Sequence, residues 1–480
     1  MAEAEVLEAL DIDRYAERPE ELLNLDRNAA LEFAPGDVEA MQLLAVRRRF
    51  AMLKDQLPVL ANLAREQNIS ELENLDDAAK LLFKHSVYKS YPISLVEKGR
   101  FDRLTQWLGK LTTVDLSTVQ VNDLDSIDDW LDALLRDAKL RIIHSTGTSG
   151  KLSFLPIGPD DMHVQTRSAM VVMQQLGQPK PEGLENIPMI VVGHRVMYNG
   201  YGAKLEAFAR DVYQGDESML YVQDPGRLNA DVLSLGGRLA AAENRGALGR
   251  AELSPSLAAR LDDFVAAQRA APERRAKFFD RIFDTLRGKR VMLSGNWAML
   301  YEMMEAGRQR GLPDGIFAPD SLIQCAGGTK GKSFPEGYRD DIKAFLGVPT
   351  INEGYGMSEI TSLMGMCEAG HYHVPPWLLA FVLDPVTGAP SPRQGTHTGR
   401  FGVIDLGVRQ RWGGVLSGDE VTMTFGQCAC GRASPHIADT VRRFSEKEGG
   451  DDKITCAGAP EAHENAMAFL ADLAADRENG

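Results

Sequence analysis

The chain has 480 residues, of which 44% are hydrophobic and 25% are charged, a composition typical of a globular protein of about two or three domains. Its formal net charge of −15 argues against non-specific nucleic-acid binding, which relies on a basic surface. No apolar run reaches the length of a membrane span, the acidic start "MAEAEVLEAL" lacks a signal-peptide pattern, and five cysteines do not suggest a disulfide framework, so we expect a cytoplasmic protein.

Residues 1–75 are rich in Leu, Ala, Glu and Arg at helical spacing and predict an N-terminal helical segment. In residues 76–380, short β-branched runs alternate with helical stretches. Strands are expected at 188–195 ("PMIVVGHR"), 289–295 ("KRVMLSG") and 321–328 ("SLIQCAGG"). Such alternation predicts an α/β core with doubly wound, mostly parallel sheets, which bind ligands beyond the carboxyl ends of their strands.

Residues 381–445 contain short runs broken by glycine, which predict a small antiparallel β subdomain. Residues 446–480 predict one hairpin and one helix, a short α+β stub.

The stretch Ala326–Ser333 ("AGGTKGKS") fits a relaxed phosphate-binding P-loop. A P-loop, however, runs directly into a helix whose N-terminus receives the phosphates. Here Ser333 is followed by "FPEGY", and the clean helix "YRDDIKAFL" begins only at Tyr338 and ends at Gly347. We therefore favour another use for these glycines.

A second glycine-rich stretch, Ser145–Lys151 ("STGTSGK"), alternates hydroxyls with glycines and ends in a lysine. Glycines let backbone N–H groups converge on an oxyanion, hydroxyls add donors, and lysine adds a positive charge. Taken alone, a flexible surface turn explains the stretch equally well, so its interpretation depends on the residues downstream.

Three stretches in order resemble the adenylate-forming superfamily, which includes acyl-CoA synthetases, luciferases and peptide-synthetase adenylation domains. Ser145–Lys151 resembles its phosphate loop, "NEGYGMSE" (352–359) its aromatic-Gly-x-Thr/Ser-Glu motif, and "LSGDEV" (416–421) its Gly-Asp motif. "CEAGHYH" and "CACGRASPHI" are most similar to the phenylacetate-CoA ligase branch and its short relatives, the acyl-protein synthetases. The resemblance spans roughly residues 80–460.

The resemblance implies that ATP and a carboxylic acid react to give an acyl-adenylate and pyrophosphate, a reaction of two anions that depends on positioning and charge neutralisation. Lys151, Ser358 and Glu359 would be catalytic, with Ser358 donating to the α-phosphate and Glu359 binding Mg²⁺. The nucleotide-binding residues would be Ser145, Thr146, Gly147, Thr148, Ser149, Gly150, Gly327, Gly328, Asn352, Tyr355, Gly356 and Asp419.

Within that set, Gly327-Gly328 and Tyr355 would lie beside adenine, and Asp419 would accept hydrogen bonds from the ribose. Structural alternatives are a plain turn at Asp419, a strand-end turn at Tyr355-Gly356 and a solvated helix-start carboxylate at Glu359.

The acid substrate is weakly specified. The segments 193–202 and 294–300 follow predicted strands and are expected to face the site. His194 and Arg195 would hold a polar group of the acid, and Tyr198 and Trp297 would line an apolar pocket; ordinary core and surface roles explain these residues equally well.

Cys367, His373, Cys428 and Cys430 offer the four soft or imidazole ligands that tetrahedral Zn²⁺ requires. His371 is an alternative ligand, and free thiols in a reducing compartment are the alternative to a metal. Zinc sites at corresponding places in some relatives favour the metal. Because all four positions would be filled by protein, the expected zinc is structural.

Relatives carry a mobile C-terminal domain with a late catalytic lysine, whereas no lysine follows Lys453 here, and the hinge-region arginine is absent unless Arg442 or Arg443 substitutes for it. Three interpretations remain: a ligase that passes the acyl group to CoA or a carrier-protein thiol, an acyl-protein synthetase that captures it on Cys456, or a non-catalytic nucleotide-binding protein. A buried structural role for Cys456 is the alternative to its use as a nucleophile. The sequence is compatible with a homodimer.

Overall fold

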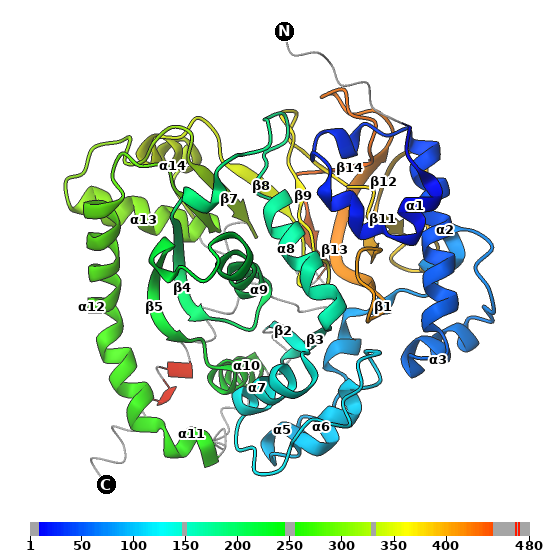
Figure 1. Cartoon of the computed structure of the whole chain (residues 1–480), viewed down its shortest axis with the longest axis horizontal. Helices are drawn as coiled ribbons and strands as arrows, with labels where there is room; N and C mark the ends of the chain where they lie inside the picture. The colour runs from blue at the N-terminus through cyan, green and yellow to red at the C-terminus, as the bar shows by residue number, and fades with distance from the viewer. Residues whose placement is uncertain are drawn as a thin grey trace.

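The structure is a computed structural model of the chain and describes residues 9–145, 151–244, 255–327, 333–444, 466–467 and 469–470. A mostly parallel sheet and an antiparallel sheet lie side by side, with helices around them (Figure 1). This architecture confirms the predicted α/β class. Of the segment 446–480, only four residues are described, and they are helical.

In the described residues, the first sheet has six strands in the order β5-β4-β6-β7-β8-β9. Its strands are β4 (Met189–Val196), β5 (Leu220–Arg227), β6 (Met292–Gly295), β7 (Leu322–Ala326), β8 (Asn352–Tyr355) and β9 (Met364–Gly365). The three strands predicted from the sequence are β4, β6 and β7, which pair in parallel as neighbours. Only the edge pair β8–β9 is antiparallel.

Helices cover both faces of this sheet because successive strand residues point to opposite sides. On one face, Ile190, Leu293 and Ile323 pack against α12, α13 and α14. On the other face, Met189, Val191 and Met292 pack against α6 to α10. The helices around this sheet are α5 (Ser94–Glu97), α6 (Phe101–Leu108), α7 (Ile127–Ala138), α8 (Met162–Val171), α9 (Gly200–Ala207), α10 (Ala230–Asn244), α11 (Pro255–Ala259), α12 (Leu261–Thr285), α13 (Trp297–Gln309) and α14 (Tyr338–Leu346).

The predicted helix start at Tyr338 and its glycine end are confirmed. Gly347 caps α14 with φ +81°, a left-handed conformation that favours glycine. At α13, the Asn296 side chain accepts a hydrogen bond from the amide of Met299 at 3.1 Å. The Asn296 cap lies just after the carboxyl end of β6, where the chain leaves the sheet, and the Gly347 cap lies before β8, where the chain returns to it.

The antiparallel sheet has the strand order β10-β14-β13-β12-β11, with β1 and β15 also paired to β13. Its strands are β1 (Phe83–Lys84), β10 (His371–His373), β11 (Leu378–Leu383), β12 (Gly395–Asp405), β13 (Gly414–Phe425), β14 (His436–Ala438) and β15 (Arg442–Arg443). The three glycine-broken runs of the sequence correspond to β11, β12 and β13. A separate hairpin consists of β2 (Arg141–Ser145) and β3 (Ser153–Ile157).

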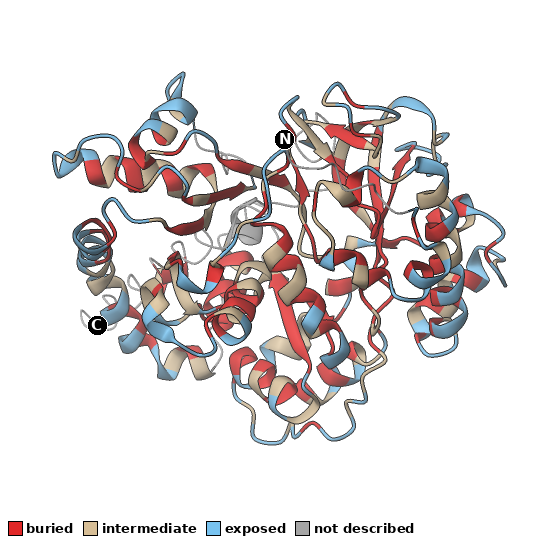
Figure 2. Cartoon of the chain, turned by 45° about the horizontal axis from the view of Figure 1, so that its top comes forward, coloured by how far each residue is buried: buried red, intermediate tan, exposed pale blue. Residues whose placement is uncertain are grey.

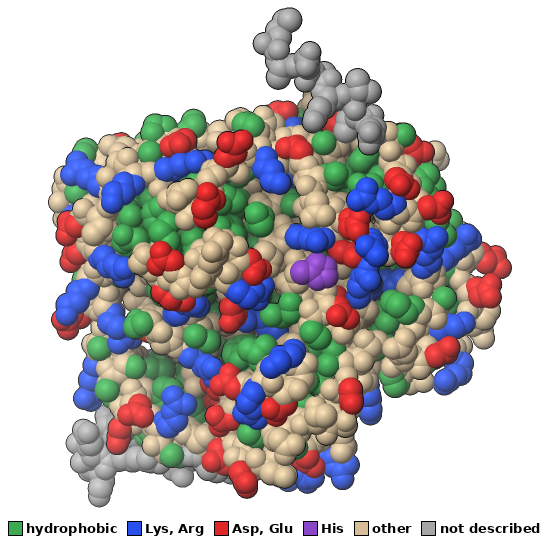
Figure 3. Space-filling model, viewed as in Figure 1, with side chains coloured by type: hydrophobic (Ala, Val, Ile, Leu, Met, Phe, Trp, Pro, Cys, Tyr) green, Lys and Arg blue, Asp and Glu red, His purple; other side chains and the backbone are tan. Residues whose placement is uncertain are grey.

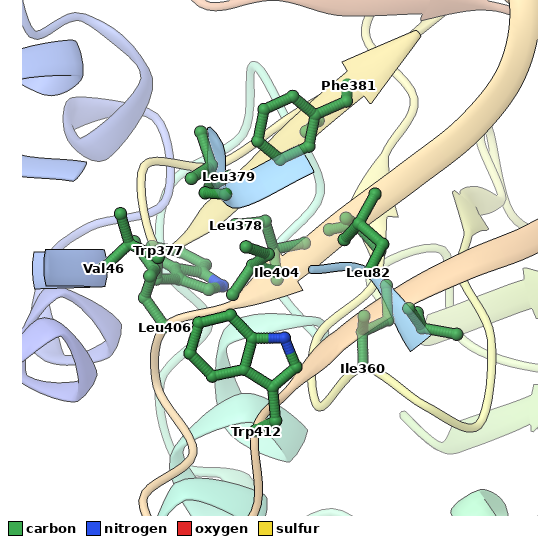
Figure 4. Close-up of a cluster of buried hydrophobic side chains, with 14 of the residues drawn as sticks. Val46, Leu82, Ile360, Trp377, Leu378, Leu379, Phe381, Ile404, Leu406 and Trp412 are labelled. Atoms are coloured by element: carbon green, nitrogen blue, oxygen red, sulfur yellow. The ribbon is translucent and has the colours of Figure 1, made fainter. Parts of the chain in front are cut away.

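The N-terminal helices pack on the antiparallel sheet rather than on the parallel one (Figure 1). They are α1 (Ile12–Glu17), α2 (Pro35–Leu53), α3 (Pro58–Glu66) and α4 (Leu75–Ala79). Val46 of α2, Trp377 and Trp412 meet in the shared core that Figure 4 shows. The indole N–H of Trp412 donates to the carbonyl of Leu81 at 2.8 Å, which satisfies the polar atom of a fully buried ring.

Burial follows the layers: the strands are buried, and the outer sides of the helices are exposed (Figure 2). On the face in Figure 3, acidic and basic side chains are interspersed, and hydrophobic side chains gather in the region of α13 and α14. Among the described residues, no helix combines the length and the apolar character needed to cross a bilayer.

Candidate functional site

A cavity of about 1940 Å³ opens at the carboxyl ends of the parallel strands. Its wall includes His194 near the end of β4, Gly295 at the end of β6 with Trp297 just beyond it, Gly327 after β7 and Tyr355 at the end of β8. Both segments predicted to face the site, 193–202 and 294–300, contribute residues to this wall. The cavity therefore lies where a doubly wound sheet binds its ligands.

The turn between β8 and β9 carries Ser358 and Glu359 at its tip. Tyr355 pairs with Met364 at the base of the turn. A Cβ on Gly356 would lie 2.5 Å from Cδ2 of Leu363, so a larger residue there would have to displace the Leu363 side chain. Leu363 thus packs against the backbone of Gly356, and Ser358 lines the main cavity.

The Glu359 carboxylate is half-buried. Burial raises its pKa, and a backbone hydrogen bond and the positive charge of Arg411 offset only part of that rise. An ionised carboxylate in such a place gains from a cation beside it, and its hard oxygens are the donors that Mg²⁺ prefers. Glu359 therefore fits the magnesium role that the sequence predicts.

Asp419 lies midway along β13 and is 6% exposed. Its carboxylate accepts a hydrogen bond from the hydroxyl of Tyr355 at 2.8 Å and faces Nε of Arg443 at 3.4 Å. Arg443 is one of the two arginines considered as a substitute for the hinge residue, and it reaches Asp419 because β15 pairs with β13. Two of the predicted nucleotide-binding side chains are therefore in direct contact.

Ser145 ends β2, and its hydroxyl lies 2.6 Å from the hydroxyl of Ser153 on β3. The ammonium of Lys151 donates to the carbonyl of Tyr91 at 2.8 Å. Thr146, Gly147, Thr148, Ser149 and Gly150 lie outside the described residues.

Residues of all three motifs line a smaller hollow of about 40 Å³. Its lining includes Ser145 and Lys151 from the first motif, Ser358 and Glu359 from the second, and Asp419 from the third. Segments separated by more than two hundred residues in the chain therefore meet at one place, as the sequence predicts.

Gly327 lines the main cavity with φ +86°, whereas Gly328 lies outside the described residues. Asn352 is buried, and its amide donates to the carbonyl of Val172 at 2.7 Å. This bond attaches the start of β8 to the end of α8 and gives Asn352 a structural contact. The helix after Ser333 begins only at Tyr338, so the relaxed P-loop does not run directly into a helix.

Cys367, His373, Cys428 and Cys430 come together, with their ligand atoms all within 4.8 Å of one another. His373 directs Nε2 toward the Cys430 sulfur at 3.3 Å, and its Nδ1 lies 2.7 Å from the Ser434 hydroxyl. A hydrogen bond that fixes the far ring nitrogen is the usual arrangement for a zinc-bound histidine. Burial, aided by the charges of His436 and Arg432, lowers the pKa of His373 to about 3, which keeps the imidazole neutral as a ligand must be.

The donor set, its closeness and its burial fit a four-coordinate structural zinc. The predicted alternative ligand His371 lies in a second group with Cys428 and His436, with its Nδ1 3.3 Å from the Cys428 sulfur. The guanidinium of Arg432 donates hydrogen bonds to the carboxylate of Glu368, at 3.0 Å, and to the side-chain oxygen of Asn28 in the N-terminal segment, at 3.2 Å. The cluster therefore lies where the antiparallel sheet meets the N-terminal segment.

Of the four residues predicted to contact the acid substrate, two line the cavity and two are bonded to other parts of the protein. His194 lines the cavity; burial lowers its pKa, although Asp224 lies 3.8 Å away. Trp297 lines it from α13. Arg195 forms an ion pair with Glu217, and the hydroxyl of Tyr198 donates to Asp132 at 2.6 Å, so both have partners within the protein.

Tyr201 on α9 lies within the segment 193–202 that the sequence predicts to face the site. Sequence reasoning missed two further cavity residues, Lys204 on the same helix and Gln165 on α8. They lie in ordinary helical sequence with no motif around them, and only the packing of α8 against α9 brings them to one cavity.

No protein-family model matches the chain, and no curated protein matches it. Solved structures that resemble it include 2-hydroxyisobutyryl-CoA ligase in complex with 2-HIB-AMP and CoA, with a TM-score of 0.48 and 16% identity over 86% of this chain and 70% of that one. Another is ATP-bound MatB from Rhodopseudomonas palustris, with a TM-score of 0.34 and 13% identity over 64% of this chain and 52% of that one. Likenesses at this level carry no functional argument, which rests instead on the residues that line the cavity.

Proposed function

We propose that the protein belongs to the adenylate-forming superfamily and activates a carboxylic acid as an acyl-adenylate, with ATP as the second substrate. The supporting observation is the convergence of Ser145, Lys151, Ser358, Glu359 and Asp419 on one hollow beside the main cavity. These residues supply two hydroxyls, one ammonium and two carboxylates, which match the needs of a nucleoside triphosphate and its metal.

In this proposal, an oxygen of the substrate carboxylate forms a bond to the α-phosphorus of ATP, and the bond from that phosphorus to the bridging oxygen breaks to release pyrophosphate. Lys151 and the hydroxyls of Ser145 and Ser358 neutralise and orient the phosphates. Asp419, held between Tyr355 and Arg443, accepts hydrogen bonds from the ribose. Glu359 would hold Mg²⁺, which neutralises phosphate charge when it is bound.

We also propose that the protein belongs to the phenylacetate-CoA ligase and acyl-protein synthetase branch of this superfamily. This proposal rests on the two cysteine-containing stretches, "CEAGHYH" and "CACGRASPHI". The arrangement of Cys367, His373, Cys428 and Cys430 supports a structural zinc there. The acceptor of the acyl group is a thiol of CoA or of a carrier protein in this proposal. Cys456, the candidate for self-acylation, lies outside the described residues.

The test is pyrophosphate release that depends on an added acid, screened over aryl, medium-chain and long-chain carboxylic acids with ATP and Mg²⁺. Release with at least one acid supports the proposal, and no release with any acid would leave a nucleotide-binding protein. CoA-dependent release of AMP would identify the ligase route. Hydroxylamine-sensitive labelling by radioactive acid that is lost in Cys456→Ala would identify self-acylation.

A further inference from the structure

Lys204 is a cation in the main cavity without a counter-ion. It lies on α9, and in the part of the chain that the structure describes its ammonium has no ion-pair or hydrogen-bond partner. Five arginines of the same wall, by contrast, form ion pairs. Those pairs are Arg227–Asp132 (2.9 Å), Arg274–Asp224 (3.1 Å), Arg275–Glu302 (2.8 Å), Arg339–Glu353 (3.2 Å) and Arg443–Asp419 (3.4 Å).

The surroundings of Lys204 disfavour its charge. Burial, with a further contribution from the charge of Arg27, lowers its pKa to about 8. The side chain is still mostly protonated at pH 7, so the protein holds an ammonium that is partly stripped of water and has no anion beside it. An anion that arrives from outside removes this cost.

Further polar groups in the same wall also lack partners. Tyr201 lies one turn before Lys204 on the same side of α9, and its buried hydroxyl has no hydrogen-bond partner within the described chain. Gln165 on α8 is 5% exposed, and its Nε2 donor is likewise unpartnered there. Buried donors without acceptors cost free energy, so a ligand with acceptor atoms is favoured here.

Lys204 and the reacting Ser358 line the same cavity. Arg27, whose charge helps to lower the pKa of Lys204, donates to the carbonyl of Leu363 at 2.9 Å, at the base of the β8–β9 turn. Ser358 and Glu359 occupy the tip. The wall of the same cavity includes apolar side chains: Ile143, Met173, Leu205, Phe208, Ile360 and Leu363.

We propose, on the basis of the proposed acid-activating function, that the substrate is a dicarboxylic acid whose far carboxylate binds Lys204, with Tyr201 and Gln165 as further donors. The near carboxylate reacts at the tip of the turn, and the methylene chain between the two carboxylates packs against the apolar wall. A monocarboxylic acid of the same length would leave the ammonium and both donors unpaired in the cavity.

The experiment compares three acids at each chain length: an α,ω-dicarboxylic acid, the matching monocarboxylic acid and the matching ω-amino acid, for example glutarate, valerate and 5-aminovalerate. The lengths run from malonate to sebacate, because the open pocket does not fix the span. Acid-dependent pyrophosphate release gives kcat/KM for each acid. At the best length we expect a preference of about 30- to 100-fold for the dicarboxylate over the monocarboxylate, the usual value of a charge-assisted hydrogen bond at a desolvated site.

Two variants test the lysine. Lys204→Met keeps the side-chain length, removes the charge and should abolish the preference while retaining activity on the monocarboxylate. Lys204→Glu should shift the preference to the ω-amino acid, a gain that a misfolded protein cannot show. Lys277→Met is the matched control, because Lys277 is 73% exposed and pairs with Glu273 on the surface of α12; it should behave as the wild type.

A wild type that prefers the dicarboxylate at no length, or a Lys204→Met variant that keeps the preference, would overturn the proposal. If no acid supports pyrophosphate release, the proposed function fails. Binding of a dicarboxylate at Lys204 can then be tested without catalysis, by equilibrium dialysis of radiolabelled dicarboxylates in the presence of the non-cleavable α,β-methylene analogue of ATP. Binding that falls at least about 10-fold in Lys204→Met supports the anion site, since that fall reflects the lost charge-assisted contact. Equal binding to both proteins, or none to either, rejects it.

Discussion

The Glu359 carboxylate is the residue on which the proposed chemistry depends most directly. Replacement by glutamine keeps the size and removes the charge that would hold Mg²⁺. We expect Glu359→Gln and Glu359→Ala to reduce pyrophosphate release by about 100-fold or more, because a metal clamp contributes several kcal/mol to the transition state. The fold should be retained, as circular dichroism and the melting temperature will show.

Glu336→Gln is the control for this prediction, since Glu336 is exposed outside the cavity. Undiminished release by Glu359→Ala would show that the residue has no catalytic role.

Asp419 should act in nucleotide binding rather than in the chemical step. Asp419→Asn weakens the acceptor that would face the ribose and the contact with Arg443 at 3.4 Å. We expect KM for ATP to rise about 10- to 100-fold, the value of one or two charge-assisted hydrogen bonds, with a smaller change in kcat. Steady-state kinetics with varied ATP measure both, and a fall in kcat alone would contradict the assignment.

At this scale the sequence predicts the residues that belong to motifs, and the structure brings Ser145, Lys151, Ser358, Glu359 and Asp419 to one hollow. It does not predict Lys204 or Gln165, because the direction in which a helix residue faces depends on which elements pack against that helix. The contact of Tyr355 with Asp419 is equally invisible in the sequence, since a single hydrogen bond joins two distant segments.

Among the elements, α7 and α10 cap each other at their N-termini. Asp231 accepts from the amide of Ile127 at 3.1 Å, and Asp128 accepts from the amide of Ala230 at the same distance. Burial, together with repulsion from the negative charge of Asp231, raises the pKa of Asp128 to about 7. Burial raises the pKa of Asp231 to about 6.

Because these pKa values exceed the unfolded value near 3.8, the folded chain binds more protons than the unfolded chain between about pH 4 and 7. The contribution of the pair to stability is therefore fully present below about pH 4 and is lost as the pH rises to 7. Asp128→Asn keeps an acceptor without a charge, so it should weaken this pH dependence and raise the free energy of unfolding at pH 8. Urea unfolding of both proteins from pH 5 to 8 measures the difference, and parallel curves would contradict it.

The cysteine and histidine cluster gives a second prediction at this scale. The purified protein should contain about one zinc per chain, the content of a single tetrahedral site. Cys430→Ser should lose the metal and lower the melting temperature. Ser434→Ala removes only the support of His373 and should weaken zinc affinity about 10- to 100-fold.

Plasma mass spectrometry measures the metal content, and Cys325→Ala is the control because Cys325 lies on β7, outside the cluster. Full zinc in Cys430→Ser would contradict the predicted ligand set.

The strands β4, β6 and β7 could be predicted because short apolar runs ending in glycine or polar residues are a local property of the chain. The pairing of short strands could not be predicted from the sequence. β1 has only two residues and joins β13 across more than three hundred positions, and no local pattern contains that information.

For the molecule as a whole, the N-terminal helices and the antiparallel sheet share one core. The sequence shows that these helices have an apolar face but not what that face covers. Trp412 is fully buried in this core and donates to Leu81. Trp412→Ala should therefore lower the free energy of unfolding by about 3–5 kcal/mol, the range for large buried side chains.

Urea unfolding at pH 7 measures this loss. Val386→Ala serves as the comparison, because Val386 is 91% exposed, and it should leave stability almost unchanged. A small effect of Trp412→Ala would show that the two parts fold independently.

Asp419 lies on a strand that is paired along both edges, with β12 on one side and β1, β14 and β15 on the other. Amide hydrogens in the middle of such a strand exchange with deuterium only when much of the molecule opens. The sugar of a bound nucleotide would thus rest on a strand held within the antiparallel sheet, beside the break in its register with β12, while its phosphates would meet the turn that carries Ser358 and Glu359. Deuterium uptake on adding ATP should accordingly change at that turn and hardly at all along β13.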